Sequence, residues 1–287
     1  MNIKENILAI PSKDGLRYES LNLMKSGIAI NFEYMLGSEG VRNLTSEADL
    51  LVVEGERIKD LERFTVALLR PIDIVKMVAA GEIPVGIAGM DTVEEYRLSW
   101  RGGSWNENRV QTLLPLGIGR CRLVLAAPQE SGFKTAQEFQ ETGTGNSMGI
   151  PVLEQFDGRT IATSYPRLTS RYFIDAYGSS GTDMMTPPKF ELREFSGSVE
   201  AAPALGLADA IADLVETGGT IEANGLREID TIFESQAVLI TNTQNKKGDD
   251  PFVDNVRDAI FRVLLNRGNP DAIARQQSFE AMIASFR

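Results

Sequence analysis

Histidine is absent from all 287 residues of this chain. Its absence removes the commonest general base, the Ser-His and Cys-His nucleophile systems and most zinc sites. Any chemistry must therefore use carboxylates, lysine, arginine, hydroxyl groups, the backbone or a metal ion carried by a ligand. The single cysteine, Cys121, cannot form an internal disulfide, which favours a reducing compartment and a packing role for its side chain.

Positive charge is also scarce, because 29 Lys and Arg stand against 40 Asp and Glu, a formal charge of −11. Without a basic field a protein cannot displace counterions from a nucleic acid, and we expect no nucleic-acid partner. Apolar runs of about 18 residues are missing, and residues 1–8 lack the pattern of a secretory signal. We expect a soluble cytoplasmic protein with no membrane contact.

Short apolar runs alternate with stretches of helical periodicity along the chain. Strands are predicted at residues 7–10, 50–54, 64–69, 85–88, 122–127, 159–163, 190–195, 210–215 and 236–241. Helices are predicted at residues 16–25, 72–80, 92–98, 166–177, 199–205, 252–266 and 271–286. Gly81 and Asp91 are expected to cap two of these helices, and residues 100–109, 128–151 and 178–188 are expected to be loops. The alternation is typical of a doubly wound α/β fold.

The most informative segment is Ala210 to Thr220, an apolar strand that runs into Thr217-Gly218-Gly219-Thr220. Glycine permits positive φ and close approach, so the backbone N–H groups of such a loop can surround a phosphate. Asp213 supplies a carboxylate that can accept hydrogen bonds from vicinal ribose hydroxyls. The alternative for the same residues is an ordinary turn between a strand and a helix.

Other motifs accompany this loop in a fixed order. They are Ala162-Thr163-Ser164-Tyr165-Pro166-Arg167-Leu168, Ser196-Gly197-Ser198-Val199-Glu200, Gly206-Leu207-Ala208-Asp209-Ala210-Ile211 and Ala223-Asn224-Gly225-Leu226, with residues 11–13, 69–74 and 86–91 in the N-terminal half. Together they cover most of residues 7–242, and the chain resembles ATP phosphoribosyltransferase, the first enzyme of histidine biosynthesis.

The resemblance implies two α/β domains like those of type II periplasmic binding proteins, with the active site in the cleft between them. Residues 1–121 and 241–287 would form the first domain, and residues 122–240 the second. The implied reaction joins N1 of the ATP adenine to C1 of phosphoribosyl diphosphate (PRPP), with inversion and loss of pyrophosphate. Mg²⁺ would arrive on the phosphates of PRPP and ATP, and no metal site made by the protein is expected.

The resemblance also implies roles for particular residues. The expected PRPP-binding residues are Asp213, Glu216, Thr217, Gly218, Gly219 and Thr220. The expected catalytic residues are Lys13, Arg70 and Glu200, and the expected nucleotide-binding residues are Tyr165 and Ser198. The alternatives are surface charges for Lys13 and Arg70, a solvated helix residue for Glu200 and a packed aromatic ring for Tyr165. A structural hydrogen-bonding role is expected for Asp209.

Only residues 242–287 follow the last predicted strand, which is too few for a separate histidine-sensing domain. We therefore expect a short-form catalytic subunit. In the resembled family this form implies a homodimer that joins a hetero-oligomer with a histidyl-tRNA-synthetase-like regulatory subunit. Two alternatives stay open, namely a non-catalytic solute-binding module of the same fold and a phosphoribosyltransferase with another acceptor, since ATP as acceptor rests on the resemblance alone.

Overall fold

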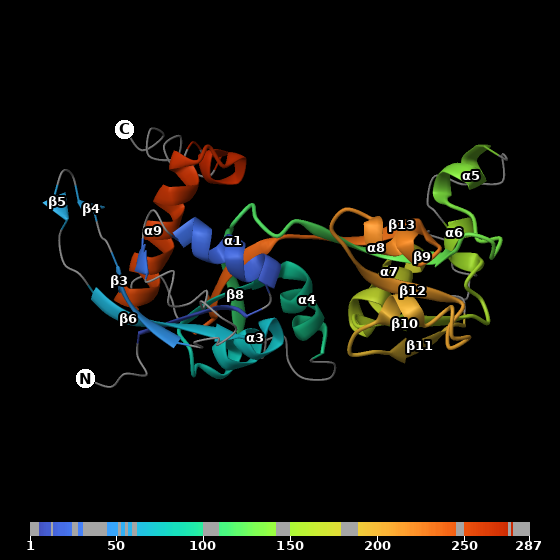
Figure 1. Ribbon diagram of the computed structural model, residues 1–287, viewed down its shortest axis with the longest axis horizontal. Coiled ribbons are helices and arrows are strands. Elements are labelled where there is room, and N and C mark those ends of the chain that lie inside the picture. The colour runs from blue at the N-terminus through green and yellow to red at the C-terminus, as the bar shows by residue number, and fades with distance from the viewer. Residues whose placement is uncertain are drawn as a thin grey trace. The chain divides into compact units, whose positions relative to one another are not determined.

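The chain folds as two compact units, Met1–Gly119 with Gln236–Arg287 (unit 1) and Arg120–Ser235 (unit 2) (Figure 1). This computed structural model describes residues 6–12, 14–24, 28–30, 45–50, 53–54, 57–58, 62–99, 109–141, 150–178, 189–244, 250–274 and 277. Each unit contains helices and its own mixed sheet, so the α/β class predicted from the sequence is confirmed.

The sheet of unit 1 has, within the described residues, the strand order β2-β3-β6-β1-β7-β14-β8. Its centre is parallel, because β1 (Ile7–Pro11) pairs with both β6 (Glu62–Leu69) and β7 (Val85–Gly89) in that sense. The remaining pairings are antiparallel and involve β2 (Ile28–Ile30), β3 (Thr45–Leu50), β8 (Val110–Pro115) and β14 (Ala237–Asn242). A separate two-stranded ladder joins β4 (Val53–Glu54) to β5 (Arg57–Ile58).

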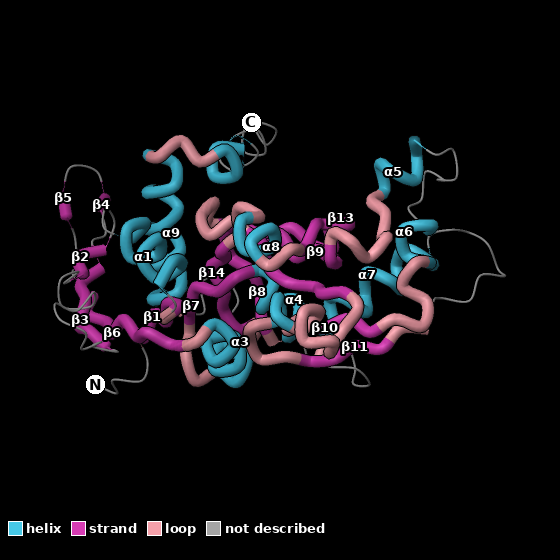
Figure 2. Tube along the Cα trace, turned by 45° about the vertical axis from the view of Figure 1, so that its right-hand side comes forward, coloured by secondary structure: helices cyan, strands magenta, loops and turns pink. Residues whose placement is uncertain are grey.

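Helices cover both faces of this sheet. Helices α1 (Asp14–Met24) and α9 (Pro251–Asn266) lie on one face, and α3 (Pro71–Ala80) and α4 (Met90–Leu98) lie on the other, as Figures 1 and 2 show for α1, α9 and α3. Strand β1 serves both cores, since Leu8 and Ile10 face the first pair and Ala9 faces the second. An apolar run without alternation is typical of such a doubly covered strand.

Of the two helix caps predicted in unit 1, one is confirmed and one is wrong. Gly81 caps α3 as expected, with φ 73° and its N–H directed at the carbonyls of Met77 and Val78. The expected cap by Asp91 is wrong, because α4 begins at Met90 with Gly89 at the N-cap position. Asp91 lies in the first turn instead, buried, and accepts a hydrogen bond from the Thr92 hydroxyl at 3.0 Å.

The sheet of unit 2 has, within the described residues, the strand order β11-β10-β12-β9-β13. Strand β10 (Thr160–Thr163) is parallel to both β11 (Glu191–Glu194) and β12 (Ala210–Val215). Strand β9 (Cys121–Pro128) is antiparallel to β12 and to β13 (Leu226–Ser235). The boundary expected at residue 240 is too late, because β14 pairs with β7 and β8 in unit 1.

Both faces of the unit 2 sheet are also covered. One face packs on α6 (Ile150–Glu154) and α7 (Pro166–Gly178) through an aromatic core. The other packs on the 3₁₀ helix η2 (Val199–Ala201) and on α8 (Gly219–Ala223). The Tyr172 hydroxyl on α7 donates to Asp230 on β13, and burial, followed by this carboxylate, raises the pKa of Tyr172 well above its ordinary value. The phenol therefore stays protonated and joins helix to strand.

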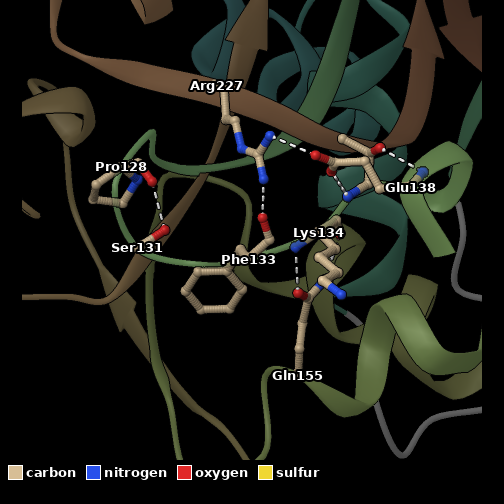
Figure 3. A network of polar contacts seen from close by, with 8 residues as sticks. Pro128, Ser131, Phe133, Lys134, Glu138, Gln155 and Arg227 are labelled. Carbon is tan, nitrogen blue, oxygen red and sulfur yellow. Dashed lines mark hydrogen bonds and ion pairs between the residues drawn. The ribbon is translucent and has the colours of Figure 1, made fainter. Parts of the chain in front are cut away.

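Residues 128–151 are not the loop that we expected, because α5 (Ala136–Glu141) and the start of α6 lie within them. A capping box begins α5, in which the Thr135 N–H donates to Glu138 Oε2 at 2.7 Å and the Glu138 N–H donates to Thr135 Oγ1 at 3.2 Å. Figure 3 shows Arg227 of β13 between Glu138 (3.0 Å) and the Phe133 carbonyl. Gln155 adds two bonds to the Lys134 backbone, so the segment is anchored to the sheet.

Glu138→Gln tests this anchor through its pH dependence. The Thr135 N–H, followed by Arg227, lowers the pKa of Glu138 below 4.5. A carboxylate whose pKa is lower in the folded than in the unfolded state stabilises the fold at pH values above the unfolded-state pKa. This stabilisation is lost as the pH falls through the folded-state pKa. We expect E138Q to melt about 2 °C lower than the parent protein at pH 7, with a difference that shrinks as the pH falls through the folded-state pKa of Glu138. The control is E141Q, whose side chain accepts a hydrogen bond from Gln137 at 3.0 Å. A melting difference for E138Q that does not change with pH would contradict the assignment.

The bounds of two further predicted elements differ in the structure, and two longer strands were not predicted. Of the strand expected at residues 50–54, residue 50 ends β3 and residues 53–54 form β4, while residues 51–52 lie outside the described residues. The helix expected at residues 199–205 shortens to η2 and turns, since Pro203 has no N–H to donate and restricts the residue before it. Strands β8 and β13 were not predicted. Of the helix expected at residues 271–286, residues 271–274 and 277 are helical, and the others lie outside the described residues.

Candidate functional site

Three loops of unit 2 leave the same edge of its sheet. Strands β10, β11 and β12 are parallel, with Thr163 opposite Glu194 and Ala212, so their carboxyl ends lie together. The chain turns from β10 to β11 on one side and then returns to β12 on the other, which makes β10 and β12 a topological switch point. In open α/β sheets, ligands bind outside the carboxyl ends of the strands at such a point.

The loop after β12 has the backbone that its glycines allow. Gly218 has φ 85° and ψ −16°, a left-handed conformation that a side chain disfavours. Glu216, Thr217, Gly219 and Thr220 are all exposed. The first N–H groups of a helical turn such as α8 (Gly219–Ala223) have no acceptor within that turn. The hydroxyls of Thr217 and Thr220 add further donors beside them. This geometry suits an oxyanion such as a phosphate.

Carboxylates of two elements flank this loop. Asp213, partly exposed on β12, accepts a hydrogen bond from the Leu214 N–H at 2.9 Å. Because side chains alternate along a strand, Asp213 shares a face with Val215 two residues later, which packs against Val199 of η2. Glu200, also partly exposed, lies in η2 on that face. Two oxygen donors therefore belong to elements on the sheet face that α8 also covers. Such donors bind hydroxyl groups or a hard cation.

Ser198, before η2, is the only non-glycine residue with positive φ among those described, at 52°. Backbone of this kind costs about 1 kcal/mol and is concentrated at functional sites. Its side chain is exposed at the same edge of the sheet.

Tyr165 lies at the end of β10 and is partly exposed. Its N–H donates to Thr163 Oγ1 at 2.9 Å, and its carbonyl accepts from Thr169 Oγ1 at 2.8 Å. The neighbouring Ser164 hydroxyl donates to the Phe195 carbonyl at 2.8 Å and so joins this loop to the one after β11. Sequence reasoning did not single out Ser164, although it lies inside a quoted motif.

Asp209 has the structural role that the sequence predicted. Its Oδ2 accepts from the Thr160 N–H at 2.8 Å, and its Oδ1 lies 3.3 Å from Arg159. Both contacts are at the amino end of β10, at the opposite edge from the three loops.

An ion pair beside the loop was missed by sequence reasoning. Arg122 on β9 and Glu228 on β13 form two parallel N–H···O bonds of 3.0 and 3.1 Å, and Arg122 also donates to Thr231 Oγ1 at 3.2 Å. A Cβ built on Gly218 would lie 3.6 Å from Glu228 Oε1. Since the partners are 106 residues apart, no local pattern in the sequence could have found them.

The two expected cationic residues belong to unit 1. Arg70 follows β6 and stands at the N-cap position of α3, exposed, at the carboxyl edge of the parallel strands. The Ser12 N–H at the end of β1 donates to the Leu69 carbonyl at 2.8 Å, so the ends of β1 and β6 lie together. Lys13 follows Ser12 and lies outside the described residues.

The described residues contain neither a cluster of metal-binding side chains nor a membrane-spanning helix. No group of three or more Asp, Glu or Cys side chains there could hold a metal ion. No helix there is long and apolar enough to cross a membrane.

Comparisons with known proteins point in one direction. The family model of HisG, ATP phosphoribosyltransferase, matches residues 70–262. An ATP phosphoribosyltransferase of Maricaulis maris (strain MCS10) is 33% identical over 216 residues, which are 75% of this chain and 60% of that relative. The chain thus spans less than two thirds of that relative's length.

One solved structure shows the same fold. One chain of the ATP phosphoribosyl transferase (HisG:HisZ) complex from Thermotoga maritima superposes with a TM-score of 0.58 at 21% identity, covering 91% of this chain and 99% of that one. A putative periplasmic sulfonate-binding protein from Methylobacillus flagellatus gives a TM-score of 0.49 at 16% identity, covering 95% of this chain and 72% of that one.

Proposed function

Because the chain belongs to the HisG family of ATP phosphoribosyltransferases, we propose that it joins N1 of the ATP adenine to C1 of PRPP and releases pyrophosphate, the first step of histidine biosynthesis. The observation that carries this proposal is the loop from Glu216 to Thr220, with its left-handed Gly218, at the carboxyl edge of β12 beside Asp213. Such a loop, next to a carboxylate on the same edge, suits a phosphorylated ribose.

The chemistry fits a protein without histidine. N1 of adenine already carries a lone pair, so the reaction needs no general base to create its nucleophile. It needs in-line placement of the two substrates, stabilisation of an oxocarbenium-like sugar and neutralisation of the departing pyrophosphate. Carboxylates supply the second requirement, and arginine, lysine and a metal ion supply the third.

We assign these tasks to individual residues. The backbone and hydroxyls of the loop hold the 5′-phosphate, with its residues Glu216, Thr217, Gly218, Gly219 and Thr220. Asp213 accepts the ribose hydroxyls, and Glu200 serves the sugar or its metal ion. Tyr165 and Ser198 serve the nucleotide, which their exposure at the same edge supports. Lys13 and Arg70 of unit 1 hold pyrophosphate or triphosphate oxygens.

Mg²⁺ enters as part of the substrates. Bound to PRPP and ATP, it neutralises phosphate charge as pyrophosphate leaves. The oxygen donors of Asp213 and Glu200 are of the type that Mg²⁺ prefers.

We also propose the assembly and the location. The Thermotoga structure is named as a HisG:HisZ complex, and we propose that this chain likewise forms a homodimer that joins a histidyl-tRNA-synthetase-like regulatory subunit in the cytoplasm. Co-expression with such a subunit and measurement of the particle mass by light scattering test the assembly. A chain that stays alone in that experiment and is fully active and inhibited by histidine would contradict it.

The test of function is to incubate the protein with ATP, PRPP and Mg²⁺ and to follow the absorbance of phosphoribosyl-ATP, with and without the regulatory subunit. We expect product only when all three are present. Consumption of PRPP with another base, but not with ATP, would indicate a different phosphoribosyltransferase. Thermal stabilisation by amino acids and not by PRPP would indicate a solute-binding module.

A further inference from the structure

The loop from Glu216 to Thr220 lies among negative side chains of its own unit. Asp213 precedes the loop, Glu216 begins it and Glu222 lies on α8. Glu228 approaches the loop from β13. Elements β9, β12, β13 and α8 carry two cations between them, Arg122 and Arg227. A ligand with several phosphate charges would therefore meet an acidic surface unless one of these cations compensates it.

Arg227 does not serve the loop. Its guanidinium contacts Glu138 of α5 and the Phe133 carbonyl, which lie with the aromatic core on the far face of the sheet. Figure 3 shows the side chain occupied in this way. Arg122 remains as the cation of these elements that faces the loop.

Arg122 is well placed for that task. It pairs across the ladder with Val215, the last residue of β12 before the loop begins. Its guanidinium reaches along β13 to Glu228, whose Oε1 lies 3.6 Å from the Cβ position of Gly218. Arg122, Glu228 and Gly218 thus form a contiguous row along one side of the loop. A bidentate arginine–carboxylate pair has fixed geometry, unlike a pair of long mobile side chains.

We propose that Arg122 supports PRPP binding by neutralising the Glu228 carboxylate, which lies beside the turn at Gly218 and would otherwise repel a bound phosphate. The inference rests on the proposed function and adds a residue to it. Arg122 acts through Glu228 and is not assigned a contact with the substrate. The pair is partly exposed, with 39% and 32% of the two side chains accessible, so solvent screens it only in part.

This role makes an asymmetric prediction for two single variants. Arg122→Gln leaves the Glu228 carboxylate without its cation beside a bound phosphate. Repulsion between these two negative charges at about 8 Å, in a partly screened site, corresponds to about a tenfold loss of PRPP affinity. Glu228→Gln removes the negative charge and should leave PRPP affinity equal to or tighter than that of the parent protein. The double variant should return to within about threefold of the parent, because neither charge remains.

A merely structural pair predicts the opposite, since both single variants and the double variant would then weaken PRPP binding alike. Arg122→Lys keeps the charge without the bidentate geometry and should fall between the parent and R122Q. The tenfold loss in R122Q should also shrink as NaCl is raised, which loss of packing would not produce.

The experiment is calorimetric titration of the full chain with PRPP and Mg²⁺ for the parent, R122Q, E228Q, R122Q/E228Q and R122K, at low and high NaCl. The matched control is Arg159→Gln, which breaks an exposed pair with Asp209 at the opposite edge of the same sheet and should leave affinity unchanged. If the parent protein binds PRPP and R122Q binds it equally well, the inference is wrong and the proposed function stands. The same holds if R122Q/E228Q binds PRPP as weakly as R122Q does. A parent protein without PRPP affinity contradicts the proposed function, and this inference with it.

Discussion

The double variant Thr217→Ala, Gly218→Ala is expected to bind PRPP at least about 100-fold more weakly than the parent protein. The threonine change removes a hydroxyl donor to a charged phosphate, worth about 1.5–3 kcal/mol. The glycine change places a side chain at φ 85°, which costs about 1–2 kcal/mol and favours a different turn. A Cβ at this position meets only Glu228 at 3.6 Å, an ordinary contact, so the effect comes from the backbone and not from a clash.

Gly225→Ala is the control for this prediction. Gly225 follows the other end of α8 with φ 69°, and a Cβ there meets nothing within 4 Å. Its variant carries a similar backbone cost without touching the loop, so it should lose stability and keep PRPP affinity. Calorimetry on both proteins separates the effects. Intact affinity in the double variant would show that the loop does not bind the phosphate.

Phe156→Ala is expected to lower the free energy of unfolding by about 3–5 kcal/mol, the largest stability effect that we predict. Phe156 is fully buried in unit 2. Its ring stacks on Phe133 with centroids 4.9 Å apart and meets the edge of Phe173 at 5.7 Å. Truncation removes this aromatic contact area and leaves a cavity, which the close-packed side chains around it cannot fill without rearranging.

Urea unfolding followed by circular dichroism measures this loss. The control is Ile174→Ala on α7, next to Phe173 in sequence but 48% exposed, which should cost less than about 0.5 kcal/mol. A loss below about 1 kcal/mol for Phe156→Ala would mean that the aromatic core of unit 2 is not packed as described.

The parts of the fold that could be predicted from sequence are those whose apolar run and terminating residues lie next to one another in the chain. Residues 7–10 form a short apolar run and are the core of β1, and α3 has a proline at its start and a glycine at its end. The loop after β12 was found for the same reason, since its strand and glycines are contiguous in the chain.

The misses have physical causes as well. Strand β13 was not predicted because bulges between Glu228 and Asp230, and between Thr231 and Phe233, break its alternation of polar and apolar residues. Helix α5 was missed because its capping box, Thr135 to Glu138, lies in a segment rich in glycine and threonine. The Arg122–Glu228 pair depends on the register of two distant strands, which no window of sequence contains.

A crystal of the protein soaked with PRPP and Mg²⁺ tests the central claim most directly. Our account predicts the 5′-phosphate within hydrogen-bonding distance of the backbone N–H groups from Gly218 to Thr220, with the ribose hydroxyls on Asp213. Density for the sugar phosphate elsewhere in the protein, with this loop unoccupied, would contradict the account.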